Sequence, residues 1–279
     1  MSEELPSKKQ ETKAFFGELA APGFGLDAAF FTAIGQRLTE FAYIPPQGQV
    51  LDMAAGTGAN LFPAAEKVGK DGRVIGIDLA EAMVKGTTAE IIDRGLHNVE
   101  MRQMDAEKLD FPDASFDRVL CGFALFFFPQ LDRTLFEVSR VLKPGGVFVA
   151  STFAAQGYPW SWYETLLKAY KLSSRVDRLV GLVTEPLERP KDIEEALKRT
   201  GFVHIHIETE EYDDRFEDEE AWWQRLWSSA DEDLLRRLNQ ERLQRFRRDA
   251  FEQLQSLKGK DGIHGRYKVL LASGTKSST

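Results

Sequence analysis

The sequence contains a single cysteine, Cys121, among its 279 residues. One cysteine cannot form an internal disulfide, and it excludes metal sites built from several thiolates. Four histidines, at positions 97, 204, 206 and 264, show no HExxH or similar ligand spacing. The sequence therefore predicts no metal ion as a cofactor.

Long apolar runs and an excess of positive charge are also missing. No run approaches the roughly 20 residues that cross a bilayer, which predicts a protein with no membrane span. The first ten residues, MSEELPSKKQ, are charged and contain no apolar segment typical of a secretory signal. The formal net charge of -8 disfavours nucleic acid as the main partner. These absences predict a cytoplasmic protein.

Short apolar runs alternate with helical segments from Gln49 onward. Five runs are predicted as strands: QVLDMA, RVIGID, VEMRQ, FDRVLCG and GVFVAST. Helices are predicted between them at 60–68, 80–94 and 131–142, and before them at 11–20 and 27–43. This alternation is typical of βαβ units and of a mostly parallel sheet with helices on both faces.

The alternation is interrupted twice after the fifth strand. Residues 154–190 are rich in aromatic side chains and predict two helices. A helix at 191–200 and the strand FVHIHIET follow, and then 208–263 begins with an acidic link, ETEEYDDRFEDEE, and continues with long helices across 221–257. The run RYKVLLAS is the seventh predicted strand. Ligands of open α/β sheets bind beyond the carboxyl ends of the strands, so both interruptions are expected to flank a ligand pocket.

Two features of the second interruption leave alternatives open. Trp222, Trp223 and Trp227 could line the pocket, but Trp223 and Trp227 are four residues apart, and packing of one helix onto the core is the favoured interpretation. Arg236 to Arg248 is rich in arginine but interleaved with acidic and apolar residues. That pattern predicts the solvated face of an amphipathic helix, with a surface for nucleic acid or an anionic membrane as the alternative.

The strongest ligand signal is VLDMAAGTGAN at 50–60, a strand followed by a small-residue turn and a helix start. Glycines allow a ligand to approach the backbone, and a helix N-terminus offers N–H groups to an anion. Leu61 occupies the third glycine position of a dinucleotide motif, and the P-loop lysine is missing. Asp78, twenty residues after Gly58, could accept hydrogen bonds from both hydroxyls of a ribose. Asp105 could accept one from an adenine amino group.

Together these motifs resemble the class I S-adenosylmethionine-dependent methyltransferases. The resemblance is carried by D-x-A-x-G-T-G from Asp52, the acid Asp78, DAEKLDFPDASFD from Asp105 and LKPGG from Leu142. Within the class, the sequence is similar to the small-molecule group that includes the ubiquinone and menaquinone C-methyltransferases. Ala54 stands where many members have glycine.

The resemblance covers roughly residues 45–153, with weaker agreement at 10–25 and 191–208. It implies an α/β, Rossmann-like, seven-stranded and mostly parallel sheet with an antiparallel last strand and helical insertions over the acceptor site. The predicted organisation is one methyltransferase domain, 1–279. Its parts are N-terminal helices at 1–44, a cofactor-binding core at 45–153, and acceptor-site insertions at 154–190 and 208–263.

The resemblance also implies S-adenosylmethionine as the cofactor, S-adenosylhomocysteine as its product, and a role for each matching residue. Asp52 would orient the loop and reach the methionine amino group, directly or through water. The methionine portion would lie against Ala54, Gly56 and Gly58, with Cys121 and Phe123 beside the reactive methyl. Asp78 would hold the ribose, and the adenine would lie against Leu79, Met83, Asp105 and Ala106. Phe24 occupies a place where relatives often have a tyrosine facing the cofactor, with a core phenylalanine as the alternative.

The predicted function is methyl transfer to a small, apolar or aromatic metabolite by in-line displacement. Such a displacement at a sulfonium needs neither a metal nor a covalent intermediate, because holding the acceptor and the methyl in line supplies much of the rate. The alternatives are a lipid or nucleic-acid methyltransferase and a non-catalytic S-adenosylmethionine-binding protein. His206 and His264 could serve as bases, but structural roles are favoured, so no catalytic residue is assigned. The methylated atom and the oligomeric state stay open.

Overall fold

A central β-sheet organises the chain. The computed structural model describes residues 7–20, 28–155, 160–172, 181–227 and 232–277. The strands are β1 Gln49–Met53, β2 Arg73–Asp78, β3 Val99–Gln103, β4 Phe116–Gly122, β5 Leu142–Phe153, β6 Phe202–Phe216, β7 Lys258–Gly259 and β8 Gly262–Lys276. Their order is β3-β2-β1-β4-β5-β8-β6, and β7 pairs with β8 outside this order.

The first five strands run parallel, and β8 is antiparallel to both of its neighbours, β5 and β6. This topology confirms the predicted α/β, Rossmann-like fold with an antiparallel last strand. The two-residue β7 is an addition to the seven predicted strands, and it forms a short hairpin with the start of β8.

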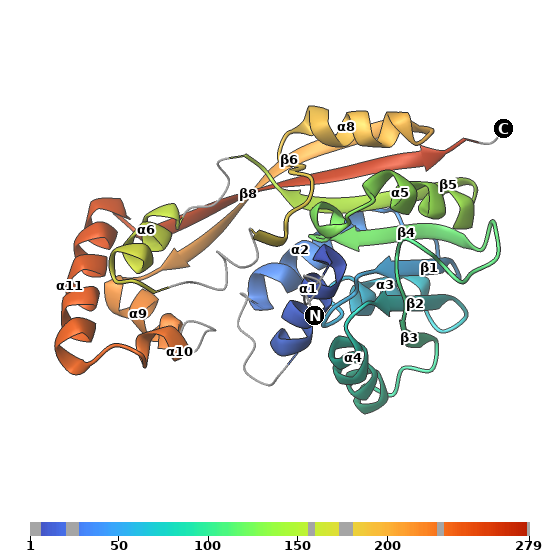
Figure 1. The fold of residues 1–279 in the computed structure, drawn as a ribbon. Helices are drawn as coiled ribbons and strands as arrows, with labels where there is room; N and C mark the ends of the chain where they lie inside the picture. Colours follow the sequence, from blue (N-terminus) through green and yellow to red (C-terminus); the bar gives the residue numbers. More distant parts are fainter. Residues whose placement is uncertain (1–6, 21–27, 156–159, 173–180, 228–231, 278–279) are drawn as a thin grey trace, which may run out of the picture.

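Helices cover both faces of the sheet (Figure 1). α2 (Ala28–Phe41), α3 (Leu61–Val68) and α4 (Glu81–Asp93) share one apolar cluster with the sheet, and α5 (Leu131–Val141) and α8 (Pro190–Arg199) share the other. Successive strand residues point to opposite faces, so Val50 joins the first cluster and Leu51 the second. The strands are therefore buried on both sides, as their continuous apolar runs predict.

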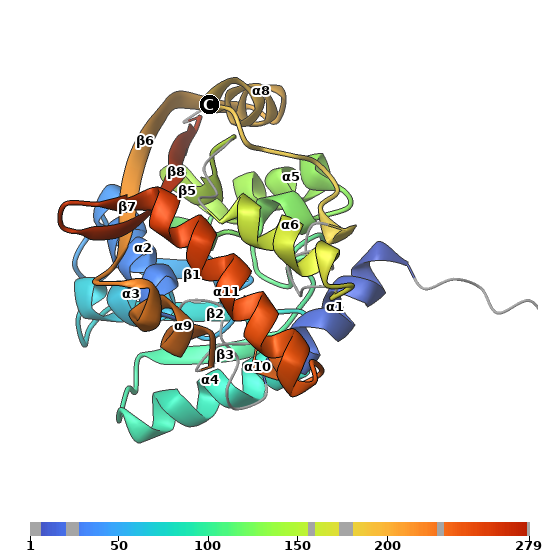
Figure 2. The same ribbon diagram turned by 90° about the vertical axis from the view of Figure 1, so that its left-hand side faces the viewer.

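A group of helices lies at one end of the molecule, away from β1, β2 and β3 in Figure 1, and faces the viewer in Figure 2. β6 and β8 are each 15 residues long and extend beyond the other strands. The helices are α6 Ser161–Ala169, α9 Glu219–Trp227, α10 Glu232–Leu235 and α11 Gln240–Leu257. We call these helices, with the adjoining ends of β6 and β8, the helical lobe.

The predicted acidic link is wrong over its first part, because β6 continues to Phe216. Acidic residues on the better buried side of this strand have arginine partners. Arg37 of α2 lies 2.7 Å from Glu210, and Arg225 of α9 lies 2.9 Å from Asp214. These pairs compensate the charge, so an acidic sequence can occupy a strand. The sequence pattern alone does not reveal partners that come from distant elements.

The other predicted helices agree with the structure apart from their ends. The described part of 221–257 lies in α9, α10 and α11, and α11 buries Phe246 while Arg245, Arg247 and Arg248 are exposed, as its amphipathic pattern predicts. In 154–190, α6 is one of the two predicted helices, and residues 173–180 lie outside the described part of the chain. Within the described ranges, no helix is long and apolar enough to cross a membrane.

Candidate cofactor site

A pocket of about 350 Å³ opens at the carboxyl ends of β1, β2, β4 and β5. The pocket wall also includes residues of two N-terminal helices, α1 (Lys8–Leu19) and α2. From α1 it receives Lys9, Thr12, Lys13 and Phe16, whose spacing places them on one helix face. The pocket therefore lies where parallel sheets of this kind bind ligands, and α1 covers part of it.

The loop after β1 adopts a left-handed backbone at three positions. Gly56 and Gly58 have φ angles of 52° and 87°, which glycine adopts without strain. Ala54 also has a φ of 52°, a conformation that costs an L-residue with a Cβ about 1–2 kcal/mol. A Cβ added to Gly58 would lie 2.5 Å from the ring of Phe62, so that glycine allows α3 to pack closely. The loop is shaped for close approach of a ligand.

Asp52 lies behind this loop and has no exposed surface. Its Oδ1 accepts a hydrogen bond of 3.0 Å from the Asn60 amide, whereas its Oδ2 has no hydrogen-bond partner among the described residues. Burial raises the pKa of Asp52 to about 7, and the nearby charge of Asp78 acts in the same direction. A buried carboxylate with a free oxygen favours a positively charged group nearby.

Asp78 joins the loops that follow β1 and β2. Its two carboxylate oxygens accept hydrogen bonds from the backbone N–H groups of Gly56 at 2.9 Å and Ala80 at 2.8 Å. Thr87 of α4 donates to the carbonyl oxygen of Gly56, so the turn is held from two sides. Burial raises the pKa of Asp78, and the backbone hydrogen bonds oppose that rise. The carboxylate lines the pocket and keeps lone pairs for ligand hydroxyls.

Asp105 lies at the part of the pocket that α1 covers. The ammonium of Lys9 is 2.8 Å from its Oδ2 and also binds Glu107, whose side chain is only 3% exposed. Burial lowers the pKa of Lys9, but its hydrogen bonds to the two carboxylates outweigh this effect and raise it. An ion pair therefore ties α1 to the loop that carries Asp105.

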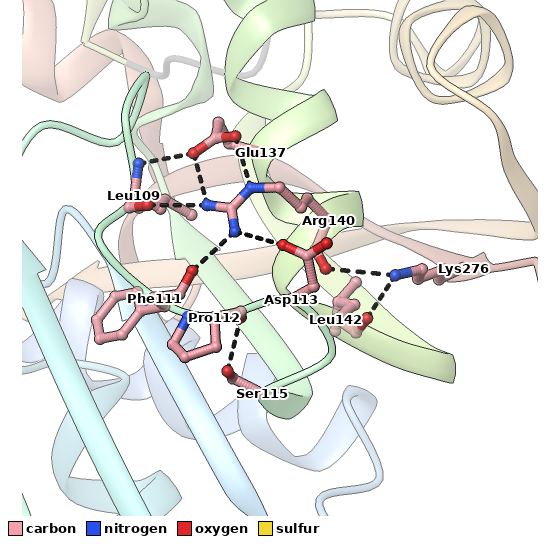
Figure 3. Close-up of polar contacts among 9 residues, drawn as sticks. All are labelled: Leu109, Phe111, Pro112, Asp113, Ser115, Glu137, Arg140, Leu142 and Lys276. Atoms are coloured by element: carbon pink, nitrogen blue, oxygen red, sulfur yellow. Dashed lines mark hydrogen bonds and ion pairs between the residues drawn. The ribbon is translucent and has the colours of Figure 1, made fainter.

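Arg140 of α5 holds the far part of the same loop, between β3 and β4 (Figure 3). It donates to the carbonyl oxygens of Leu109 and Phe111 at 2.8 and 2.7 Å, and it pairs with Glu137 and Asp113. Glu137 accepts a hydrogen bond from the Leu109 N–H at 2.8 Å. The hydrogen bonds that Arg140 donates to these two carboxylates raise the pKa of Arg140, which keeps it charged. Arg140 thus holds the loop at residues 109–113, outside the pocket, while the first residues of the loop, 104–106, lie in the pocket wall.

The part of the pocket nearest β4 and β5 is aromatic. Phe123, Phe153 and Phe31 of α2 line it, and the Phe123 ring centroid lies 4.6 Å from that of Phe153 and 5.2 Å from that of Phe31. Behind them, Phe30 is 2% exposed and contacts all three rings, as well as one tyrosine each from β6 and β8. One buried ring therefore connects the pocket wall with the long strands of the helical lobe.

Most of the predicted cofactor residues line this pocket. They are Ala54, Gly56, Asp78, Leu79, Met83, Asp105, Ala106 and Phe123. Asp52, Gly58 and Cys121 are not part of the wall, and Phe24 lies outside the described residues. Cys121 is fully buried on the α5 side of the sheet, where burial raises the pKa of its thiol, and Gly122 lines the pocket instead.

Several residues of the wall were not predicted from the sequence, among them Thr12, Phe16, Thr32 and Asn60. The first two share a face of α1, a spacing that fits any amphipathic helix. Asn60 carried the pattern of a helix N-cap, which is its position relative to α3. Neither signal distinguishes a ligand contact from ordinary helix structure.

The tryptophans of the helical lobe pack against one another. Trp222 and Trp223 are 4% and 6% exposed, and Trp222 lies 6.3 Å from Trp160 while Trp223 lies 6.1 Å from Trp227, measured between ring centroids. None of these rings lines the pocket, and no described residue of either late region does. The packing interpretation of Trp223 is therefore confirmed within the described part of the chain.

The histidines also lie outside the pocket wall. In β6, a β-bulge lies between Val203 and His206, and His204 has a φ of 49°, so strict alternation of side chains fails there. His264 bonds to Asp213 and Asp261 at 2.6 and 3.1 Å, and these carboxylates raise its pKa.

The residues of the pocket fit an adenosyl ligand that ends in an amino acid. Asp78 and Asp105 can accept hydrogen bonds from hydroxyl and amino groups, and the orphaned Oδ2 of Asp52 favours a cation. The left-handed loop at Gly56 leaves open space, because a Cβ added there would contact nothing within 4 Å. Fold and site together define a class I S-adenosylmethionine-dependent methyltransferase.

Comparisons with known proteins agree with this class. A family model described as a methyltransferase domain matches residues 45–230. The aklanonic acid methyltransferase of Streptomyces sp. strain C5 is 35% identical over 211 residues, which cover 72% of this chain and 96% of that relative. The demethylmenaquinone methyltransferase of Geobacillus stearothermophilus is 43% identical over 101 residues, 36% of this chain and 43% of its own length.

A solved structure has the same fold. It is phosphoethanolamine N-methyltransferase 2 of Haemonchus contortus, in complex with phosphomonomethylethanolamine and S-adenosylhomocysteine. Its TM-score is 0.61 at 19% identity, and the match covers 98% of this chain and 61% of that one. The chain belongs to the methyltransferase domain family, and it is an enzyme that uses S-adenosylmethionine.

Proposed function

We propose that this enzyme methylates a small, apolar or aromatic metabolite. The observation that carries the proposal is the aromatic part of the pocket, where Phe31, Phe123 and Phe153 gather at the ends of β4 and β5. Such rings favour a flat or apolar acceptor and exclude water. Two relatives are named for the small molecules aklanonic acid and demethylmenaquinone, which supports the same class of acceptor here.

The residues of this chain bind, orient and shield the reacting groups. When bound, S-adenosylmethionine supplies a methyl group activated by a positively charged sulfur. Asp78 and Asp105 hold the nucleoside by accepting hydrogen bonds, while the buried charge of Asp52 favours the positive amino-acid end. The rings around Phe123 exclude water and attract positive charge through their faces.

Positioning is therefore the proposed source of rate for the in-line displacement. His206 and His264 lie outside the pocket wall, so replacing either by alanine should lower kcat by less than about tenfold, below the 10²–10⁴ of a lost general base. A thousandfold loss in one variant, with normal cofactor binding, would identify that histidine as the base.

We infer that α2 and the strand ends contribute acceptor contacts, and the acceptor-site role of 154–190 and 208–263 stays a prediction. Phe31 and Thr32 of α2 lie in the pocket wall, whereas no described residue of 154–190 or 208–263 does. We also infer a cytoplasmic setting, which is consistent with a single, fully buried cysteine.

Transfer of a labelled methyl group tests the proposal. The protein is incubated with methyl-labelled S-adenosylmethionine and fractionated cell extract, and products are identified by mass spectrometry. We expect label in a small-molecule fraction, and its loss in Asp78→Ala. Label confined to phospholipid or to nucleic acid would favour those acceptors instead. Binding of S-adenosylhomocysteine without transfer to any fraction would indicate a non-catalytic binding protein.

A further inference from the structure

Asn60 follows the loop after β1 and occupies the N-cap position of α3. It directly precedes α3, yet its side chain makes no capping hydrogen bond to that helix. The side chain lines the pocket instead, although the residue is only 5% exposed. A buried amide that gives up its capping role needs another partner, because an unpaired polar group in such a place is costly.

Asp52 determines which way this amide faces. The Asn60 Nδ2 donates to the Oδ1 of Asp52 at 3.0 Å, and an ionised carboxylate can only accept. The nitrogen must therefore face Asp52, and the amide oxygen is left for a different donor. No described residue donates to that oxygen. A Cβ added to Gly122 would lie 2.7 Å from the amide nitrogen and 3.0 Å from its oxygen, so the glycine leaves the amide room at the wall.

The charges around Asn60 favour a cationic donor. Asp52 is fully buried behind it, and Asp78 lies close enough for its charge to raise the pKa of Asp52. The lysines of the pocket wall both come from α1, and Lys9 is already held by Asp105 and a second carboxylate. A positively charged group is therefore stabilised at the amide oxygen of Asn60.

We propose that Asn60 binds the α-amino group of the cofactor's methionine portion, and that Asp52 is a positioning residue acting through it. This inference rests on the assignment of S-adenosylmethionine to the pocket. Asp52 itself has no exposed surface. The amide of Asn60, which donates to Asp52, is therefore the group that contacts the ligand. The amide oxygen accepts from the ammonium, and the buried carboxylate stabilises the amide orientation that this contact requires.

Two ligands separate this contact from a general structural role. S-adenosylhomocysteine carries the amino-acid portion, and 5′-methylthioadenosine lacks it. Calorimetry on the full chain should show that Asn60→Ala lowers the affinity for S-adenosylhomocysteine by about 10- to 100-fold, the range for a lost hydrogen bond to a charged group. The same variant should change the affinity for 5′-methylthioadenosine by less than about threefold.

Asn98→Ala is the matched control. Asn98 donates to the carbonyl oxygen of Gly69 at 2.8 Å and is not part of the pocket wall, so its removal should leave both affinities unchanged. Equal losses of both ligands in Asn60→Ala, or no loss of either, would overturn the proposal. If Asn60→Ala does not fold, Asn60→Ser is measured and interpreted in the same way. Failure of the unaltered chain to bind either ligand would instead reject the cofactor assignment.

Gly122→Ala gives an independent result. The added methyl group should displace the Asn60 amide. The affinity for S-adenosylhomocysteine is therefore expected to fall, while the affinity for 5′-methylthioadenosine is much less affected. In the background of Asn60→Ala, the same change should cost little further affinity, because the displaced group is already gone. Full additivity of the two losses would contradict the proposed contact.

Discussion

The pocket loops and the helical lobe are built in different ways. The pocket buries polar groups and holds non-glycine residues in left-handed backbone: Ala54 and Phe123 have φ angles of 52° and 50°, and one oxygen of Asp52 has no partner among the described residues. The lobe buries large rings, with Trp222 in contact with Trp160. Two left-handed non-glycine residues and a buried carboxylate oxygen without a described partner thus lie at the pocket, where a ligand can use them.

The difference shows that tryptophan content is a poor guide to a ligand site. The helical lobe is rich in tryptophan, but its described rings fill its own interior. Each large ring buries about 150–250 Å² and can hold a small group of helices together. The pocket is lined by phenylalanines instead, among them Phe31, Phe123, Phe153 and the run at 126–128.

The largest expected effect is on the stability of the lobe. Trp222→Ala should lower the free energy of unfolding by about 3–5 kcal/mol, because the side chain is 4% exposed and packs on three other aromatic rings. Affinity for S-adenosylhomocysteine should change by less than about threefold. Denaturant unfolding and calorimetry measure the two quantities, and Trp222→Phe should lose less stability. A large loss of affinity in the folded variant would show that the lobe and the pocket are coupled.

The pocket should behave in the opposite way at Asp52. Burial raises its pKa to about 7, so the folded chain binds a proton that the unfolded chain has released, and the free energy of unfolding falls as pH rises from about 4 to 7. Asp52→Asn removes this penalty and should be more stable than the parent above pH 7, by about 1.4 kcal/mol per unit of pKa shift.

The same substitution should lower the affinity for the cofactor. The ionised form of Asp52 favours the ammonium, so the affinity of the parent chain should fall as pH drops below about 7, whereas Asp52→Asn should bind weakly at every pH. Denaturant titrations and calorimetry across pH 5 to 8 test both halves. A variant that is destabilised above pH 7 would contradict the burial penalty.

Asp78→Ala should weaken the binding of S-adenosylhomocysteine by about 1–3 kcal/mol, because the ribose hydroxyls lose their partner and the turn loses two hydrogen bonds. Its folding should be less affected than that of Trp222→Ala, which keeps the two regions distinct. Calorimetry gives the affinity, and Asp71→Ala, at an exposed position outside the pocket wall, is the control. Tight binding of NAD by the parent chain without any response to S-adenosylhomocysteine would reject the assigned cofactor.

The smallest effect is expected at Ala54. Ala54→Gly removes a Cβ from left-handed backbone, which relieves strain, but glycine also raises the entropy of the unfolded chain. The free energy of unfolding should rise by less than about 1 kcal/mol, with cofactor affinity nearly unchanged. Denaturant unfolding detects this shift. A clear loss of stability would show that the Ala54 methyl group packs in the wall and is not merely tolerated there.

The sequence alone predicted the parallel core and most of the residues that the structure places in the pocket wall at the ends of β2 and β3. The reason is local: βαβ alternation brings the carboxyl ends of parallel strands to one edge, so Asp78 and Asp105, each close to the end of a strand, must lie near the glycine loop. Each of these signals lies within a single strand, turn and helix. The antiparallel last strand followed from the family resemblance in the same way.

Only the tertiary structure decided which distant segments meet. Lys9 and Asp105 are 96 residues apart, and no periodicity predicts their ion pair. The orientation of the Asn60 amide depends on the burial of Asp52, and the acidic part of β6 depends on arginines from two helices. Burial and charge compensation are properties of a packed environment, because desolvation and partner distance have no value until the elements are in place.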